Sequence, residues 1–370
     1  MGHRVVFIDL ARALAVVFML YGHTVNALLA PRYQAGTWFD VWQFQRGLTS
    51  SLFLLLSGFA FSVATTRHWQ SHLAWSPALV KRLRRFGLLI LLGYGLHFPV
   101  PRFVLLPTAT DAQWRALLGV DVLQLIGVTL IAVQLLVMVA RSRRVFTGLA
   151  LGLAALAVLA TPWAWSIDWA ARLPPALAAY LTPAAGSLFP LVPWSAFLLL
   201  GAALGQLYAR WDHERLTRYA NLMLLAPGAV MLALGYSERL AGGTWFGGPG
   251  GFIPAQFLIR SGACLLMLGG LAHASRRISR LPHVFSAMAQ ETLVIYFVHL
   301  CLVYGSVWNP GLYQAFGPTL GPGFVFVVVV MLVGAMAGLA WYWNGLKHIH
   351  PRAAKWVSIS ALTALVARLL

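Results

Sequence analysis

Charged side chains are scarce in this 370-residue chain, where they make up 10% of the residues. Acidic groups are the rarest, with 9 aspartates and glutamates against 27 lysines and arginines. A soluble domain is typically about one-quarter charged, whereas 60% of this chain is hydrophobic. The composition therefore excludes an ordinary soluble enzyme and predicts an integral membrane protein that crosses the bilayer many times.

Other familiar features are also missing. Both cysteines, Cys264 and Cys301, fall in apolar segments, which favours packing over a disulfide. The first apolar segment carries Asp9 and Arg12 and lacks a small-residue cleavage site, so it does not resemble a cleavable signal. The sequence contains no Gly-Lys-Ser phosphate loop and no zinc-type set of His and Cys ligands. We therefore predict no metal.

The net charge of +18 does not indicate a nucleic-acid partner. The basic residues gather at the ends of apolar segments, among them Arg84, Arg143, Arg277 and Lys347. Positive charge is enriched on the cytoplasmic side of membrane proteins. The bias predicts that both termini are cytoplasmic, with the lipid bilayer as the partner.

Windows of about 20 apolar residues predict an all-α protein with about ten core transmembrane helices in a single domain, 1–370. A weaker segment at 354–370 is either an eleventh helix or lies in the membrane interface. The predicted spans are 6–28, 47–66, 84–101, 117–140, 145–164, 187–208, 219–236, 254–275, 286–306 and 322–345.

The first span carries three ionisable groups besides Tyr21: Asp9, Arg12 and His23. Such groups are costly inside a bilayer and mark function by default. Arg12 and His23 are eleven residues apart, which places them on one helix face about 16 Å apart. Asp9 can pair with Arg12 one turn away. His23 has a proton affinity suited to a general base near neutral pH, although a histidine bonded to a neighbouring helix is an equally open interpretation.

The second feature is the basic run Lys81-Arg82-Leu83-Arg84-Arg85 at the predicted cytoplasmic end of the third span. A membrane anchor accounts for most runs of this kind. The functional alternative is a clamp in which Lys81, Arg82, Arg84 and Arg85 bind the phosphates of a nucleotide-bearing donor.

Further polar groups lie in other spans. Asp121 and Gln124, near the outer end of the fourth span, can orient a histidine, bond a substrate hydroxyl, or simply link two helices. His97 and His299 can line a cavity or be bonded by the backbone. Glu291, at the inner end of the ninth span, is expected to pair with an arginine of a nearby loop.

Tryptophans are frequent in and beside the predicted outer connections, for example Trp38 and Trp42. Aromatic belts at the membrane interface explain most such residues. A surface on which a sugar acceptor stacks is the alternative.

Five pieces of sequence stand in a recognisable order along the chain. They are Ile8–Arg12 with His23, Phe53–Phe59, Val122–Gly127, Phe189–Trp194 with Leu200–Gly205, and Tyr296–Leu300. Together they resemble the transmembrane acyltransferase superfamily, and most closely the branch of heparan-α-glucosaminide N-acetyltransferase and its bacterial relatives. The arginine–ten residues–histidine pattern also resembles bacterial O-acyltransferases of cell-surface glycans.

The resemblance implies a bacterial cytoplasmic (inner) membrane enzyme that transfers an acyl group across the bilayer. Acetyl-CoA or another acyl-CoA would be the donor, with its phosphates near residues 81–85 and its thioester along the Arg12 face. The acceptor would be the amine or hydroxyl of an extracytoplasmic sugar or glycan, which loses its proton to His23. Asp9 would fix Arg12, and Asp121, Gln124, His97 and His299 would contact the substrate.

Two other classes fit a chain of this composition. A transporter or flippase would bind a glycan or lipid without consuming a thioester. A non-catalytic subunit would copurify in a fixed ratio with a larger complex and would not bind acyl-CoA.

Overall fold

A computed structural model of the chain describes residues 5–211, 215–242, 252–278 and 281–370, and within these ranges it contains helices and no β-strand. The all-α prediction is therefore confirmed. The chain separates into two compact units. The first comprises Met1–Thr49, Leu96–Trp114 and Ser275–Leu370, and the second comprises Ser50–Gly95 and Arg115–Ala274. We describe each unit by itself.

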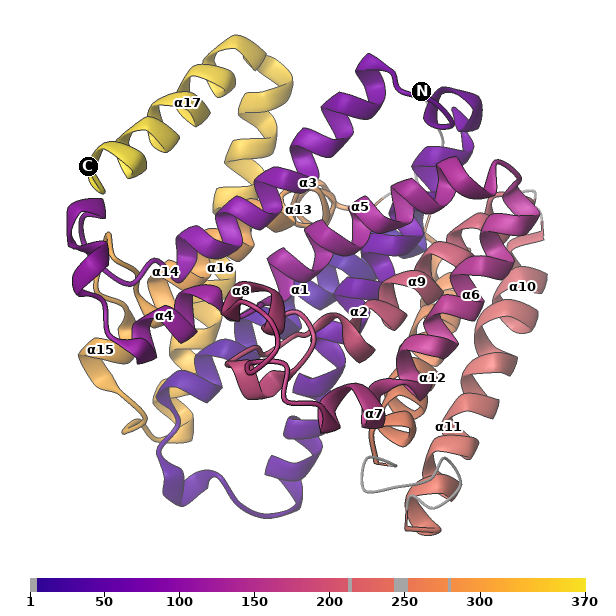
Figure 1. Cartoon of the computed structure of the whole chain (residues 1–370), viewed down its shortest axis with the longest axis horizontal. Helices are drawn as coiled ribbons and strands as arrows, with labels where there is room; N and C mark the ends of the chain where they lie inside the picture. Colours follow the sequence, from indigo (N-terminus) through magenta and orange to yellow (C-terminus); the bar gives the residue numbers. More distant parts are fainter. Residues whose placement is uncertain (1–4, 212–214, 243–251, 279–280) are drawn as a thin grey trace. The chain divides into compact units, whose positions relative to one another are not determined.

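The first unit is organised around α1, which packs against α13, α14, α15 and α16 (Figure 1). Its interior is aliphatic, with Val16 and Leu20 of α1 and Ile295 of α14 fully buried. Its helices are α1 (Val6–Leu28), η1 (Pro31–Tyr33), the start of α2 (Thr37–Thr66), η3 (Phe103–Thr108), the start of α4 (Asp111–Leu118), α13 (His283–Gln290), α14 (Thr292–Tyr304), α15 (Leu312–Phe316), α16 (Pro322–Ile349) and α17 (Pro351–Ala367).

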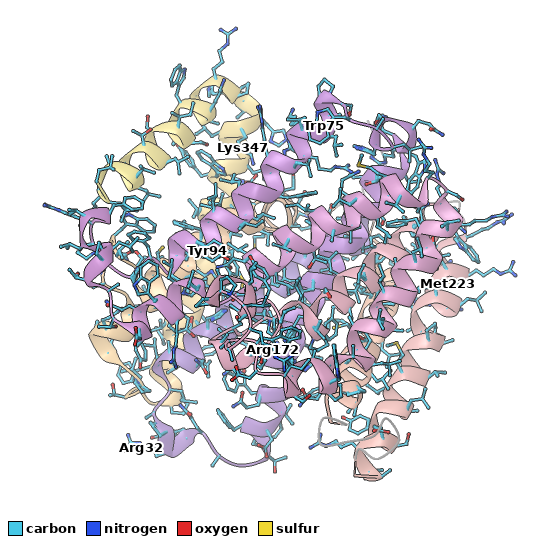
Figure 2. All side chains as sticks on the ribbon, in the orientation of Figure 1. Arg32, Trp75, Tyr94, Arg172, Met223 and Lys347 are labelled. Carbon is cyan, nitrogen blue, oxygen red and sulfur yellow. The ribbon has the colours of Figure 1, made fainter. Side chains whose placement is uncertain are left out.

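The second unit is organised around α9, which packs against α5, α6 and α7. Within this unit the hydroxyls of Tyr94 and Tyr180 lie 3.1 Å apart, and Figure 2 labels Tyr94. Besides the remainder of α2 and α4, its helices are η2 (Trp69–His72), most of α3 (Pro77–Leu96), α5 (Val122–Ala140), α6 (Arg143–Leu159), α7 (Thr161–Ser166), α8 (Pro175–Ala178), η4 (Pro183–Ala185), α9 (Leu191–Tyr208), α10 (Leu216–Tyr219), the π-helix η6 (Ala220–Leu225), α11 (Ala226–Leu240) and most of α12 (Phe252–Ser275).

Within the described ranges, seven helices are long and apolar enough to cross a membrane, or eight if the bent pair α13 and α14 forms one span. Two further predicted spans are helical but less suited to cross. One is α3, which carries the four cations of residues 81–85, and the other is α6, which has 17 residues. The orientation of the termini and the single domain remain predictions.

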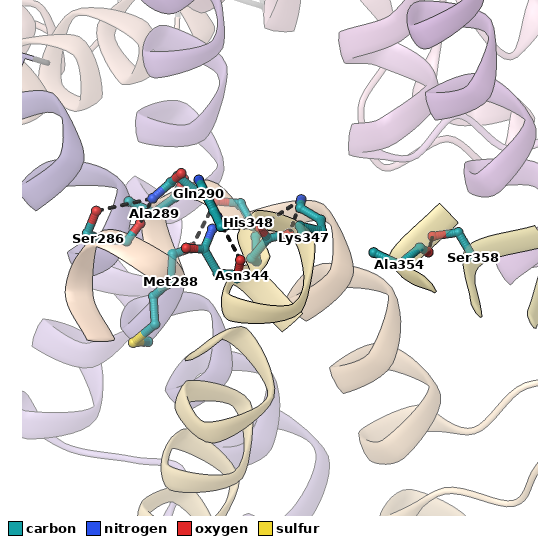
Figure 3. Close-up of polar contacts among 11 residues, drawn as sticks. Ser286, Met288, Ala289, Gln290, Asn344, Lys347, His348, Ala354 and Ser358 are labelled. Atoms are coloured by element: carbon teal, nitrogen blue, oxygen red, sulfur yellow. Dashed lines mark hydrogen bonds and ion pairs between the residues drawn. The ribbon is translucent and has the colours of Figure 1, made fainter. Parts of the chain in front are cut away.

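The predicted continuous helix 286–306 is broken. It is divided into α13 and α14, which bend by 78° at Glu291. The carboxylate of Glu291 is buried and accepts hydrogen bonds from Asn344 Nδ2 at 2.9 Å and Lys347 Nζ at 2.8 Å, both on α16 (Figure 3). The expectation that Glu291 pairs with a loop arginine is therefore wrong. Its ion-pair partner is Lys347, which lies one turn after Asn344 on α16. This contact joins the break to α16.

Other predicted boundaries shift for identifiable reasons. The predicted span 117–140 becomes α4 and α5, because Asp121 accepts a hydrogen bond from Val122 N at 2.7 Å and caps the start of α5. The second helix begins at Thr37 rather than residue 47, since helical backbone continues through the mixed aromatic and polar residues 37–46 that precede the apolar run. The third helix spans Pro77–Leu96 rather than 84–101.

Three glycines bring α2 and α9 into close contact within the second unit. A Cβ atom at Gly58 of α2 would collide with the carbonyl oxygen of Leu198, and one at Gly201 of α9 would collide with the carbonyl oxygen of Leu55. A Cβ atom at Gly205, one turn after Gly201, would collide with the carbonyl oxygen of Phe59. Small residues spaced four apart allow membrane helices to approach backbone to backbone. The glycines of two sequence motifs are thus explained by packing.

We expect Gly201→Ala to destabilise the protein, because the added methyl group meets backbone rather than a flexible side chain. Overpacking of this kind typically costs about 1–3 kcal/mol. Thermal unfolding of the detergent-purified protein measures the change.

The control is Gly152→Ala in α6, where an added Cβ meets nothing within 4 Å. This change should be neutral or slightly stabilising, because alanine favours helix over glycine by about 1 kcal/mol. Equal melting temperatures for the two variants would contradict the packing role of Gly201.

Candidate active site

Helix α1 carries the three ionisable groups that the sequence singled out. Arg12 Nη1 lies 4.0 Å from Asp9 Oδ1, which confirms the predicted pair three residues apart. Their side chains are 29% and 13% exposed. His23 lies half-buried near the other end of the same helix. The helical spacing therefore holds Arg12 and His23 on one face of a single rigid element.

His23 belongs to a cluster with two residues of α14, all within the first unit. Its Nδ1 lies 3.2 Å from the hydroxyl of Tyr304, and the Tyr304 ring stands perpendicular to its own at 5.5 Å. The ring of His299 lies 5.3 Å away. The structure thus brings together His23 and His299, which lie far apart in the sequence.

His299 is fully buried, and its Nδ1 donates a hydrogen bond to the carbonyl oxygen of Ile295 at 2.8 Å. A carbonyl oxygen only accepts, so Nδ1 carries the proton and Nε2 is the acceptor nitrogen of the neutral ring. Among the described residues this Nε2 has no hydrogen-bond partner. Buried polar atoms are nearly always paired, so His299 presents an unused acceptor beside His23.

A chain of hydrogen bonds extends the cluster to α2. Arg46 Nη1 donates to Asn26 Oδ1, and Asn26 Nδ2 donates to the Tyr304 hydroxyl at 3.3 Å. A guanidinium can only donate, so it fixes which end of the Asn26 amide faces Tyr304. The Arg46 guanidinium also lies 5.4 Å from the ring centre of Trp42. Arg46 therefore orients the tyrosine that contacts His23.

Sequence reasoning missed Arg46, Asn26 and Tyr304. Arg46 was overlooked because the predicted second span began one residue after it. Trp42, which was expected to be an interface anchor or a sugar platform, is only 7% exposed, whereas Trp38 is 88% exposed. A cation beside an apolar run was the one signal that could have identified this part of the site.

The basic run lies in the second unit, and its members point in different directions. Arg82 is half-buried and donates to Thr65 Oγ1 at 2.8 Å and to Gln134 Oε1 at 3.1 Å. Lys81, Arg84 and Arg85 are exposed. Arg82 therefore joins α3 to α2 and α5, and three cations face outward.

Gln124 in α5 is the other predicted residue with an unusual environment. It is fully buried, and among the described residues neither atom of its amide has a hydrogen-bond partner. Gly93 of α3 makes room for it, because a Cβ there would overlap Gln124 Oε1. Asp121 caps α5, as described above, and His97 lies half-buried directly after α3, in the first unit.

We expect Tyr304→Phe to lower the stability of the folded protein, because it removes the hydroxyl that contacts His23 and Asn26 while keeping the ring. A hydrogen bond of this kind contributes about 0.5–1.5 kcal/mol. Tyr313→Phe is the control, since Tyr313 packs 6.3 Å from Tyr304 but is 46% exposed. Equal shifts in melting temperature would mean that the Tyr304 hydroxyl contributes nothing.

The family described as heparan-alpha-glucosaminide N-acetyltransferase, catalytic, matches residues 4–236. The matched segment includes α1 and the basic run of α3 but ends before α14. No curated protein matches the chain.

Proposed function

The chain belongs to the heparan-alpha-glucosaminide N-acetyltransferase catalytic family, a family of membrane acetyltransferases, and we propose that it transfers an acyl group from cytoplasmic acetyl-CoA or another acyl-CoA to an extracytoplasmic sugar. The acceptor is an amino sugar or a glycan hydroxyl. The observation that carries the proposal is the contact of His23 with His299 and Tyr304, which gives one membrane helix a titratable group held by two residues of another.

His23 acts as the general base. The Asn26 amide donates to the Tyr304 oxygen, and the Tyr304 hydroxyl lies 3.4 Å from the carbonyl oxygen of His23. When the Tyr304 hydroxyl donates to this carbonyl oxygen, the Tyr304 oxygen accepts a hydrogen bond from His23 Nδ1. His23 then carries its proton on Nδ1, and its Nε2 is the basic nitrogen. His23 Nε2 removes a proton from the acceptor amine or hydroxyl while the nitrogen or oxygen of that acceptor attacks the thioester carbon. The carbon–sulfur bond then breaks, and the leaving thiolate takes this proton from His23 Nε2, which restores the neutral base.

The acyl donor is held by cations. Lys81, Arg84 and Arg85 are exposed, and arginine forks match the oxygens of phosphates. Arg82 takes part through its bonds to α2 and α5. Within the first unit, Arg12, paired with Asp9, lies on the same face of α1 as His23 and faces the thioester end of the donor.

The acceptor side uses the remaining polar groups. Among the described residues, His299 of the first unit offers an acceptor nitrogen without a partner, and Gln124 of the second unit offers an amide without a partner. Asp121 and His97 are half-buried. Holding both reactants in place removes much of the entropic cost of their encounter. The charge bias supports an orientation with the donor side in the cytoplasm. The location in a bacterial cytoplasmic membrane follows from the family resemblance, and the protein acts alone or with further copies or subunits.

We expect His23→Gln to abolish acyl transfer, because glutamine keeps hydrogen bonding but cannot take up a proton at neutral pH. General-base catalysis typically contributes about 10²–10⁴-fold, and His23→Ala should lose as much. The measurement is thiol release from acetyl-CoA by purified protein supplied with amino sugars and glycans.

The control is His350→Gln, which removes an exposed histidine between α16 and α17. It should leave turnover unchanged. Near-normal turnover in His23→Gln would rule out the base role, and lack of turnover by the unmutated protein with every acceptor would contradict acyl transfer itself.

The side of donor binding is testable with sealed vesicles. Acyl-CoA added outside should bind to inverted vesicles, whose cytoplasmic face is exposed, and not to right-side-out vesicles. Reversing the charge at Arg84 and Arg85 should weaken this binding about 10-fold or more, because charge-assisted bonds to phosphate are lost.

The matched control reverses Arg352 and Lys355, two exposed cations of α17. Equal donor affinity in both double variants would leave residues 81–85 as a membrane anchor. Binding to right-side-out vesicles would overturn the orientation.

A further inference from the structure

A pocket of about 590 Å³ lies in the second unit at the ends of α2, α5 and α6. This volume falls within the range typical of small-molecule sites, about 300–1,000 Å³. Three of the lining side chains are arginines, and none of the described lining residues is acidic. The residues that line the pocket are Thr66, Arg67, His68, Trp69, Gln70, Ser71, Arg141 and Arg143.

One side of the pocket is formed by Arg143, whose guanidinium is held by two contacts. Arg143 Nη2 donates to the carbonyl oxygen of Thr66 at 3.1 Å, and its guanidinium lies 5.9 Å from the ring centre of Trp69. A guanidinium has five N–H donors, and this contact uses one. Arg143 is also the first residue of α6, and the start of a helix favours anions. The remaining donors are therefore oriented in advance for an anionic ligand.

Arg141 stands where its own backbone disfavours it. Its φ is +52°, and it is the one non-glycine residue with positive φ among the described residues. Glycine is the usual residue at such a helix C-terminus, because a Cβ destabilises this conformation. The indole of buried Trp69 donates to the carbonyl oxygen of Arg141 at 2.9 Å and holds it there. Strained residues of this kind concentrate at functional sites.

The surroundings are electropositive and rigid. Burial, with the nearby Arg82 and His68, lowers the pKa of His72, which follows the lining residue Ser71. Beneath the pocket, Thr66 Oγ1 bonds Gln206 at 2.8 Å, and neighbouring Thr65 accepts the bond from Arg82. The end of α2 that forms the pocket is therefore held by polar contacts to α3 and α9.

We propose that this pocket binds a phosphate-bearing ligand through Arg141 and Arg143, beside Trp69. Arginine forks suit the oxygens of a phosphoryl group, and buried Trp69 positions both arginines. Two sources share this chemistry, namely a soluble nucleoside phosphate from the cytoplasm and the headgroup of an anionic phospholipid. The binding goes beyond acyl transfer, because it requires no turnover and uses none of Lys81, Arg84 and Arg85.

Two variants and a matched control test the proposal on the full chain in lipid nanodiscs. Arg141→Gly removes a cation and places at φ +52° the residue that this backbone prefers, so the protein should fold at least as well as the unmutated chain. Arg143→Gln removes the second cation. Arg144→Gln is the control, because Arg144 is exposed next to Arg143 but does not line the pocket.

In phosphatidylcholine nanodiscs, adenosine 3′,5′-bisphosphate is titrated by calorimetry. In the second arm, the melting temperature is compared in nanodiscs with and without phosphatidylglycerol. A soluble source predicts saturable binding that weakens about 10-fold or more in Arg141→Gly and Arg143→Gln and stays unchanged in Arg144→Gln. A lipid source predicts the same pattern in the stabilisation by phosphatidylglycerol.

Either pattern supports a phosphate site and identifies its source. Absence of both responses in the unmutated protein, or equal responses in all three variants, would overturn the proposal. Because no step depends on thioester chemistry, an inactive but ligand-binding protein would contradict the acyltransferase proposal and leave this one standing.

Discussion

The constraint on which this structure depends is the free-energy cost of burying a polar group without a hydrogen-bond partner. The interior is overwhelmingly apolar, and a buried polar atom that loses water must find a partner within the protein. Glu291 finds Asn344 and Lys347, and Arg82 finds Thr65 and Gln134. These few contacts each join different helices, so they specify which helices meet. Glycine contacts such as that of Gly201 then decide how closely the backbones approach.

The same constraint gives meaning to the places where pairing is incomplete. Several buried hydroxyls lack a described partner, including those of Ser51 and Thr129. Hydroxyls of this kind are common in helices and weakly informative, because small side-chain rotations satisfy them. An imidazole nitrogen and a primary amide are larger losses. Among the buried groups that lack a partner in the described part of the chain, His299 and Gln124 are two that the sequence had independently marked as candidates.

The sequence predicted the features that depend on local spacing. The helical class follows from apolar run length, and the Asp9–Arg12 pair follows from three-residue spacing on a helix. It did not predict the bend at Glu291, because an apolar run looks the same whether the helix continues or breaks. It also missed Tyr304 and Arg46 as contributors to the His23 cluster, since contacts across 281 and 20 residues leave no local pattern. The family match ends at residue 236 and does not reach α14 either.

Charge bias alone places cations on one side of a membrane but does not distinguish their roles. The burial and hydrogen-bond partners of each cation do distinguish them. Arg82 is drawn inward and joins helices, whereas Lys81 remains exposed. Arg143 holds the last carbonyl of α2, and Arg141 occupies a backbone conformation that glycine would adopt with less strain. A residue needed only as a positive charge could stand at a neighbouring exposed position, as Arg144 does, without this strain. Arg141, which has a left-handed backbone conformation at the end of α5, is therefore better explained by the position that this backbone gives its side chain than by its charge alone.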